Sequence, residues 1–231
     1  MKKHIQFVFI MVFTISYLSS AQTVDNILKE HFKVINQDKI SNLTSKTTKG
    51  ILYQNGFEVD LYVAQKRADK MRQVLSFNGQ NHTVVFNQNN GWEQNQFAGH
   101  TQPQAFNDAQ VASIKISANL DSRIKSYVNN NAAFEYIGIE LLENEEHYKL
   151  KLETQGIGEE HVWINKKTYT LTQIKNIKSN VVTLFKDYKT VNGMLFPHET
   201  HIKSPAGEAK IIITSIEFNL DMDDVLFKIK S

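Results

Sequence analysis

Histidine and glutamate side chains gather in one short segment whose composition suggests metal binding. His198, Glu199 and His201 stand together there. A zinc-binding histidine pair on a helix needs a spacing of about four residues, so that both side chains share one face. Here the spacing is three, and the segment after Pro197 has the pattern of a strand, on which His198 and His201 point to opposite faces. We therefore expect two ordinary strand histidines and no metal ion.

A repeated triplet is the second candidate for acid–base chemistry. Glu145-Glu146-His147 returns as Glu159-Glu160-His161, and the two copies would form a carboxylate–imidazole cluster if they met. A hairpin turn near Gly156 instead places His161 opposite about Leu152, roughly 16 Å along the strand from His147. We expect solvated strand ends here.

The common signatures of enzymes are absent from the sequence. The chain has no cysteine, no Gly-x-Ser-x-Gly elbow and no phosphate-binding loop, and Gly156 and Gly158 lack the third glycine of a dinucleotide site. A Ser, His and Asp triad assembled from distant strands is still compatible with the spacing. We expect a protein that is not an enzyme and has no cofactor, with a hydrolase as the least favoured alternative.

The first residues have the pattern of an export signal. Lys2 and Lys3 precede an apolar run from Ile5 to Leu18, and Ser19 and Ala21 supply the small residues of a cleavage site before Gln22. The run is shorter than the roughly 20 residues of a membrane-spanning helix. We expect a signal peptide over 1–21, export to the periplasm and a single domain over 22–231.

The exported part is electrically balanced. The whole chain has 26 basic and 24 acidic residues, and the signal removes two lysines and no acid, which leaves 24 of each sign. A nucleic-acid-binding protein usually carries a basic excess. The balance therefore argues against a nucleic-acid partner.

Hydrophobic periodicity predicts a mainly β protein with a few helices. Apolar residues recur at helical spacing over 23–36, 106–118 and 120–128. From Lys46 onward most segments alternate with a period of two and are separated by turn pairs such as Asn55-Gly56 and Asn78-Gly79. We count about eleven strands and expect one antiparallel sheet, closed or half closed on itself, with a break around Pro103.

Aromatic residues are spread through nearly every predicted strand, with 14 Phe and 8 Tyr in the chain. This distribution fits a plain core under the helices, and it also fits a sheet that lines a cavity with one face. The residue pattern alone leaves both alternatives open.

Two segments resemble the outer membrane lipoprotein-sorting proteins of the LolA family, in particular their Bacteroidetes type. The first is Lys66-Arg67-Ala68-Asp69-Lys70-Met71, and the second is Gly91-Trp92-Glu93-Gln94-Asn95-Gln96-Phe97. Ala68 and Gln96 replace two prolines of the family pattern. The agreement in order extends over nearly the whole exported part.

The resemblance implies an incomplete antiparallel β-barrel with a helical lid, as in LolA, LolB and LppX. It implies that Arg67 helps to lock the lid by hydrogen bonds and that Met71 lies near the cavity mouth. For an acyl-chain cavity of this kind we choose the following lining residues: Leu61, Val63, Leu75, Phe77, Phe86, Trp92, Val111 and Ile114.

Three functions remain in order of preference. The first is a periplasmic carrier that binds the acyl chains of lipoproteins for sorting to the outer membrane, as a monomer in transient contact with membrane-bound transport machinery. The second is a binding or sensor module for another lipid or amphiphilic ligand, because one fold serves many ligands. The third is the hydrolase, which would need a convergent polar site.

Overall fold

The computed structural model describes residues 11–228, with side chains from Thr23 onward. Its helices are α1 (Met11–Ile35), α2 (Gln37–Ser41), α3 (Asp108–Ala118) and α4 (Arg123–Asn129), with two short 3-10 helices, η1 (Gln96–Ala98) and η2 (Asp224–Phe227). The predicted signal peptide and its predicted cleavage site lie outside the described residues or in the part described only as helical backbone. None of the helices described is long and apolar enough to cross a membrane.

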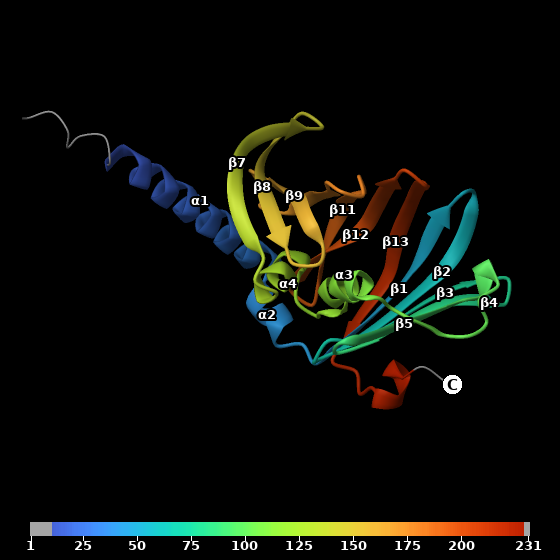
Figure 1. Cartoon of the computed structure of the whole chain (residues 1–231). Helices are drawn as coiled ribbons and strands as arrows, with labels where there is room; N and C mark the ends of the chain where they lie inside the picture. Colours follow the sequence, from blue (N-terminus) through green and yellow to red (C-terminus); the bar gives the residue numbers. More distant parts are fainter. Residues whose placement is uncertain (1–10, 229–231) are drawn as a thin grey trace, which may run out of the picture.

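All strands of the described chain belong to one antiparallel sheet, which confirms the predicted fold class (Figure 1). In chain order they are β1 (Ser45–Gln54), β2 (Phe57–Lys66), β3 (Lys70–Phe77), β4 (Gln80–Asn87), β5 (Asn90–Asn95), β6 (Gln104–Ala105), β7 (Ala133–Leu142), β8 (Glu145–Thr154), β9 (Gly158–Asn165), β10 (Leu171–Asn176), β11 (Val182–Val191), β12 (Met194–Ser204) and β13 (Gly207–Phe218).

The sheet holds 13 strands, more than the predicted number. One addition is β6, which pairs with Trp92 and Glu93 directly after Pro103, where we predicted a break. Only two residues of β6 take part in the pairing, so the strand is too short for a periodic sequence pattern to predict it. Elsewhere the turn chemistry was predictive, because Asn55 and Gly56 have the positive φ angles, 52° and 81°, of a tight hairpin.

The order of the strands leaves the barrel open. It runs β6-β5-β4-β3-β2-β1-β13-β12-β11-β10-β9-β8-β7, so that β6 and β7 are unpaired edges. These two edge strands are consecutive along the chain, and the segment that joins them contains α3 and α4. The open sheet thus has a first wing, which ends at β6, and a second wing, which ends at β7. The helices α3 and α4 cross between the two wings and lie in the hollow of the sheet (Figure 1).

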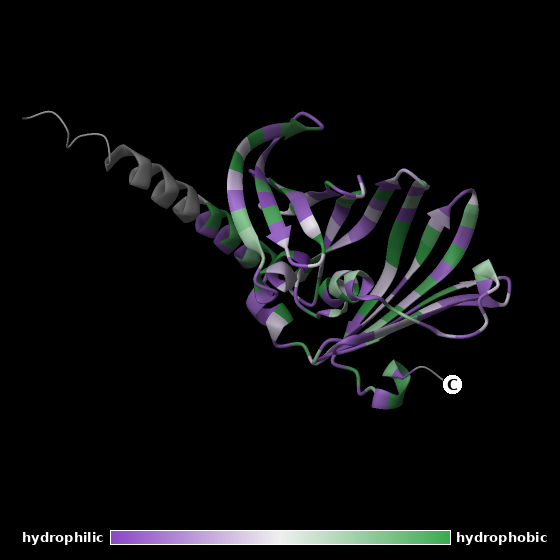
Figure 2. Ribbon diagram, viewed as in Figure 1, coloured by the Kyte–Doolittle hydropathy of each residue, from purple (hydrophilic) through white to green (hydrophobic). Residues whose placement is uncertain are grey.

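Side-chain alternation separates the concave face of the sheet from the convex face. On β2, Val63 packs with Met71 and with Val111 of α3, which places this set on the concave face. The neighbouring Ala64 packs with Phe227 of η2 on the convex side. Figure 2 shows the alternation of hydrophobic and hydrophilic positions along the strands.

The largest core cluster lies under α1 and α4 on the other wing. Leu28 of α1 and Tyr127 of α4 pack there with Leu150, Leu152 and Val162 of β8 and β9. A second cluster is built around Ile35, Ile40 and Met194 and closes the end of the central strands with α2. Neither α2 nor η2 was predicted, because helices this short show no repeated hydrophobic spacing.

Candidate ligand-binding site

The first wing gathers five of the residues that we chose for the cavity and its mouth. Met71 and Phe86 are buried in one cluster, and Val63, Val111 and Ile114 pack against it. Met71 lies opposite Phe86 in the strand register, which fixes both on the concave face. Here the lid helix α3 closes directly onto the sheet.

Three further predicted residues follow the same face away from the lid. Leu61 lies opposite Leu75 in the β2–β3 register. Phe77 is two residues beyond Leu75, and its ring meets Phe57 edge-on with centroids 5.3 Å apart. Leu75 and Phe77 are partly exposed, so this part of the concave face is apolar and uncovered.

Trp92 does not belong to this surface, and its predicted place is wrong. It lies opposite Val85 in the β4–β5 register, whereas Phe86 lies opposite Gly91. Because Phe86 is on the concave face, Trp92 must be on the convex one. The sequence pattern predicts the alternation in β5 but does not indicate which of the two sets of side chains faces inward.

The central strands contribute apolar residues that our choice missed. Leu52 of β1 lies opposite Val59 of β2 and Ile211 of β13, and all three share the concave face with Leu61. The partly exposed members of this central strip are Leu52, Ile202, Ile211, Ile213 and Ile216. Three consecutive isoleucines at 211–213 hide the alternation in β13, which explains the omission.

The lid helix α3 contacts both wings of the sheet. A side-chain carbon on Gly91 would lie 2.3 Å from the ring of Phe106, so glycine is required for the close approach at the N-terminal side of the helix. On the other wing, such a carbon on Gly156 would lie 2.8 Å from that of Ala112. A pocket of about 370 Å³ lies beside α3 and this β8–β9 turn.

Arg67 fastens the lid to the sheet. Its Nε donates to the Leu43 carbonyl at 2.7 Å and its Nη2 to the Ile40 carbonyl at 3.1 Å. Nη2 also donates to Oδ1 of Asp121 at 3.0 Å, and Nη1 lies 3.5 Å from Oδ2. Asp121 stands between α3 and α4, so Arg67 joins the end of β2, the α2 segment and the lid.

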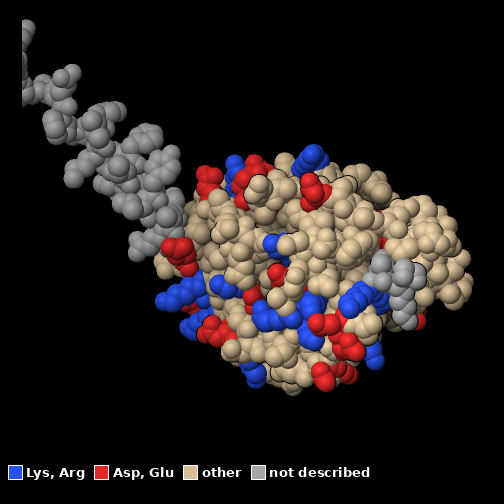
Figure 3. Space-filling model, turned by 60° about the horizontal axis from the view of Figure 1, so that its bottom comes forward, with Lys and Arg blue, Asp and Glu red and all other residues tan. Residues whose placement is uncertain are grey.

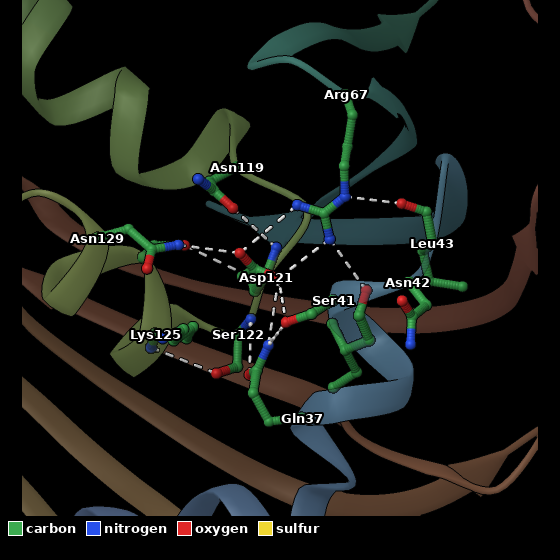
Figure 4. A network of polar contacts seen from close by, with 12 residues as sticks. Gln37, Ser41, Asn42, Leu43, Arg67, Asn119, Asp121, Ser122, Lys125 and Asn129 are labelled. Atoms are coloured by element: carbon green, nitrogen blue, oxygen red, sulfur yellow. Dashed lines mark hydrogen bonds and ion pairs between the residues drawn. The ribbon is translucent and has the colours of Figure 1, made fainter.

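Asp121 is the centre of this polar network (Figure 4). Besides Arg67, it accepts hydrogen bonds from Ser41 at 2.9 Å, Gln37 at 3.2 Å and Asn129 at 3.0 Å. Burial alone would raise the pKa of its carboxyl, but these hydrogen bonds and the charge of Arg67 hold the pKa below its usual value. The carboxylate is therefore ionised and tightly held at neutral pH.

A second polar contact, made by Gln65 of β2, holds the lid against the sheet. Gln65, two residues before Arg67, donates to the carbonyls of Ser117 at 2.7 Å and Asn119 at 3.1 Å. These carbonyls end α3 and would otherwise lack partners inside the helix. Gln65 is buried on the concave face, so its amide replaces solvent at the helix end.

The histidines singled out in the sequence stay apart in the structure. His198 is buried, and His201 contacts Glu199 beside it. His147 lies opposite Asn165, whereas His161 lies opposite Lys151, one residue from the expected Leu152, so the two triplets stay apart. Among the residues with described side chains, no group of three or more potential ligands could hold a metal ion.

Comparison with known proteins identifies the fold of this chain. No family model and no curated protein matches the sequence. A LolA superfamily protein from Nitrosomonas europaea superposes with a TM-score of 0.60 at 12% identity, covering 90% of this chain and 97% of its own. The chain has the LolA-like fold.

Two further solved structures share the LolA-like fold with this chain. A DUF1329 family protein from Desulfovibrio piger has a TM-score of 0.60 at 12% identity and covers 87% of this chain and 97% of its own. A putative outer membrane lipoprotein-sorting protein domain from Vibrio parahaemolyticus has a TM-score of 0.56 at 11% identity, with 88% and 97% covered.

The structure shows the surroundings of Ala68 and Gln96, the two positions at which this chain departs from the family pattern. The bond from Arg67 to Ala68 is a cis peptide. Gln96 uses its side-chain oxygen to accept from the backbone N–H of Asn81 at 2.7 Å, a contact that a proline could not make.

Proposed function

We propose that this protein is an acyl-chain carrier of the periplasm, whose cargo is lipoprotein destined for the outer membrane. One observation carries the proposal. The concave face presents a strip of partly exposed apolar side chains on the central strands, beside a helix that is fastened by polar groups at one end. The names of the fold neighbours, which include a putative lipoprotein-sorting domain, support this choice of cargo.

The energetics of such a carrier need no covalent chemistry. Each buried methylene group contributes about 0.8 kcal/mol, so an acyl chain gains substantially by leaving water for the apolar strip. The strip itself is open, and the buried cluster under α3 becomes accessible to the chain only if the lid moves. Arg67, Asp121 and Gln65 are the contacts that would release or hold it, since they fasten α3 to the sheet.

The proposal includes how the carrier works with other molecules. We propose that it acts as a monomer without catalysis and that it meets membrane-bound transport machinery only transiently. Nucleic acid is not among its partners. Charges of both signs are interspersed on the face drawn in Figure 3, an arrangement that does not attract a polyanion.

A matched pair of substitutions tests whether acyl chains bind the concave face. Leu52→Asp places a charge in the apolar strip, whereas Ile51→Asp places it on the convex side of the same strand. Both positions are partly exposed and adjacent on β1, which makes Ile51→Asp the matched control. We expect Leu52→Asp to weaken binding of a fluorescent fatty-acyl probe at least about tenfold and Ile51→Asp to have little effect. Equal effects would contradict the proposed site.

The lipoprotein cargo needs its own measurement. The exported protein is incubated with membrane vesicles that hold a lipoprotein, and lipoprotein released into the soluble fraction is quantified. Release that Leu52→Asp abolishes supports the carrier. Binding of the acyl probe without release would instead favour a module for another amphiphile, and failure of both would refute the proposal.

A further inference from the structure

Lys46 has an unusual place on the concave face. It lies opposite Gln65 of β2 and Phe218 of β13, which puts its side chain on the inner side of the sheet, near the α2 end. Its Nζ lies 5.7 Å from the centre of the Phe196 ring. The rings of Phe196 and Phe218 stack with centroids 5.6 Å apart, so the ammonium group stands beside an aromatic wall.

Nothing in the described chain balances this charge. Many other lysines have a carboxylate partner; Lys66 and Lys70, for example, both bind Asp224 at 2.8 and 2.7 Å. Among the described residues no ion pair or hydrogen bond involves the Lys46 ammonium, which stands over the ring of Phe196. Desolvation lowers the pKa of Lys46 to about 8. The fold therefore keeps a cation at a place where a cation is costly.

Neighbouring polar groups do not explain the lysine as a structural element. The side-chain nitrogen of Gln65, directly opposite, is already used to hold Ser117 and Asn119 at the end of the lid. Thr48, two residues along the same face, is neutral. Neither Gln65 nor Thr48 carries a negative charge, so an anion bound beside Lys46 would remove the electrostatic cost.

We infer that Lys46 binds the anionic group of an acyl ligand, so that this protein also accepts acidic lipids that carry a carboxylate or a phosphate. The inference rests on the acyl-binding part of the proposed function but not on lipoprotein sorting. The inference also implies how the ligand is oriented on the sheet. Lys46 and Leu52 share one face of β1 and lie roughly 20 Å apart along the strand. The anionic group would lie at the α2 end and the acyl chain would follow the strip toward Leu52.

The surroundings of Lys46 explain why an anionic group on the ligand should change the affinity strongly. An ion pair in water contributes little, because solvent screens both charges. Beside Phe196 and Phe218 the screening is weaker, and the ammonium has already lost part of its hydration. Charge on the ligand should therefore change affinity by about tenfold or more, which corresponds to one ordinary charge-assisted hydrogen bond.

The experiment compares ligands that differ only in their head. A saturated fatty acid, the alcohol of the same length and the lysophosphatidic acid of the same length are titrated into the exported protein and two variants. Lys46→Gln removes the charge, and Lys49→Gln is the control because Lys49 is exposed on the opposite face of β1. We expect the protein to prefer one or both acidic lipids over the alcohol by at least about tenfold. Lys46→Gln should abolish that preference without weakening alcohol binding, and Lys49→Gln should preserve it.

The outcomes separate the two proposals. Preference for the fatty acid identifies a carboxylate ligand, preference for the lysophosphatidic acid a phosphate ligand, and both support the inference if they depend on Lys46. Alcohol binding without any preference, or a preference that survives Lys46→Gln, would overturn the inference while the acyl carrier stands. No binding of any of the three would overturn both. Thermal unfolding checks the variant, and Lys46→Gln should be at least as stable as the parent, since it removes a desolvated charge.

Discussion

At the scale of one residue, we expect His31 to make the fold sensitive to acid. His31 is 2% exposed in α1, and its Nδ1 donates to the Tyr169 carbonyl at 2.8 Å. Burial lowers the pKa of His31 to about 4, although the hydrogen bond to Tyr169 opposes the shift. Between the unfolded value near 6.5 and this folded value, the unfolded chain binds the proton first. Stability therefore falls as the pH falls through that window, by roughly 3 kcal/mol in total.

His31→Asn tests this residue, because asparagine keeps a donor for Tyr169 and cannot titrate. We expect the free energy of unfolding, measured by urea titration, to lose less on going from pH 7 to pH 4 in the variant than in the parent. His82 is a suitable control position, since it is partly exposed and paired with Glu93 at 3.1 Å. An unchanged pH profile for His31→Asn would show that another group governs acid stability.

The lid is the element whose attachment can be tested separately. Asp121→Asn keeps the shape of the side chain but removes the charge that Arg67 binds. We expect a loss of roughly 2 kcal/mol in the free energy of unfolding, because the carboxylate is largely buried while Arg67 is partly exposed. Amide hydrogen exchange should accelerate in α3 and α4 more than in the sheet.

A surface ion pair provides the control for the lid variant. Asp187 binds Lys189 at 2.7 Å with both side chains about half exposed, and exposed pairs contribute only about 0–1 kcal/mol. Asp187→Asn should leave exchange in α3 unchanged. Equal protection of α3 in the Asp121→Asn variant and the parent would mean that apolar packing alone holds the lid.

The C-terminal segment gives the whole molecule a second layer outside the barrel. Phe227 of η2 is fully buried against Ala64 and Met222 on the convex face, and Asp224 binds Lys66 and Lys70 on the same side. Phe227→Ala should lower the free energy of unfolding by about 3 kcal/mol, because it opens a cavity in a packed cluster. Chemical denaturation measures the loss.

Val225 in the same segment is the matched control, with 60% of its surface exposed. Val225→Ala should change stability by less than about 0.5 kcal/mol. If both variants were equally mild, the segment would not contribute to the global unfolding transition. If Phe227→Ala also altered acyl binding on the concave face, the two layers would be energetically coupled.

The sequence by itself determined the period of two, the Asn-Gly turns and hence a long antiparallel sheet. These are local properties, in which each residue and its neighbours restrict the backbone. It also pointed to Arg67 through a family resemblance, and the structure places this guanidinium against the lid.

Only the tertiary structure decided which face of each strand is concave. Alternation divides a strand into two sets without naming the inner one, so Trp92 was misplaced and Leu52 was overlooked. Asp121 and Lys46 were also invisible, because their significance depends on partners brought together, or withheld, by strand order. Arg67 meets Asp121 across 54 residues of sequence, and Lys46 lacks a carboxylate only because of what the fold sets around it.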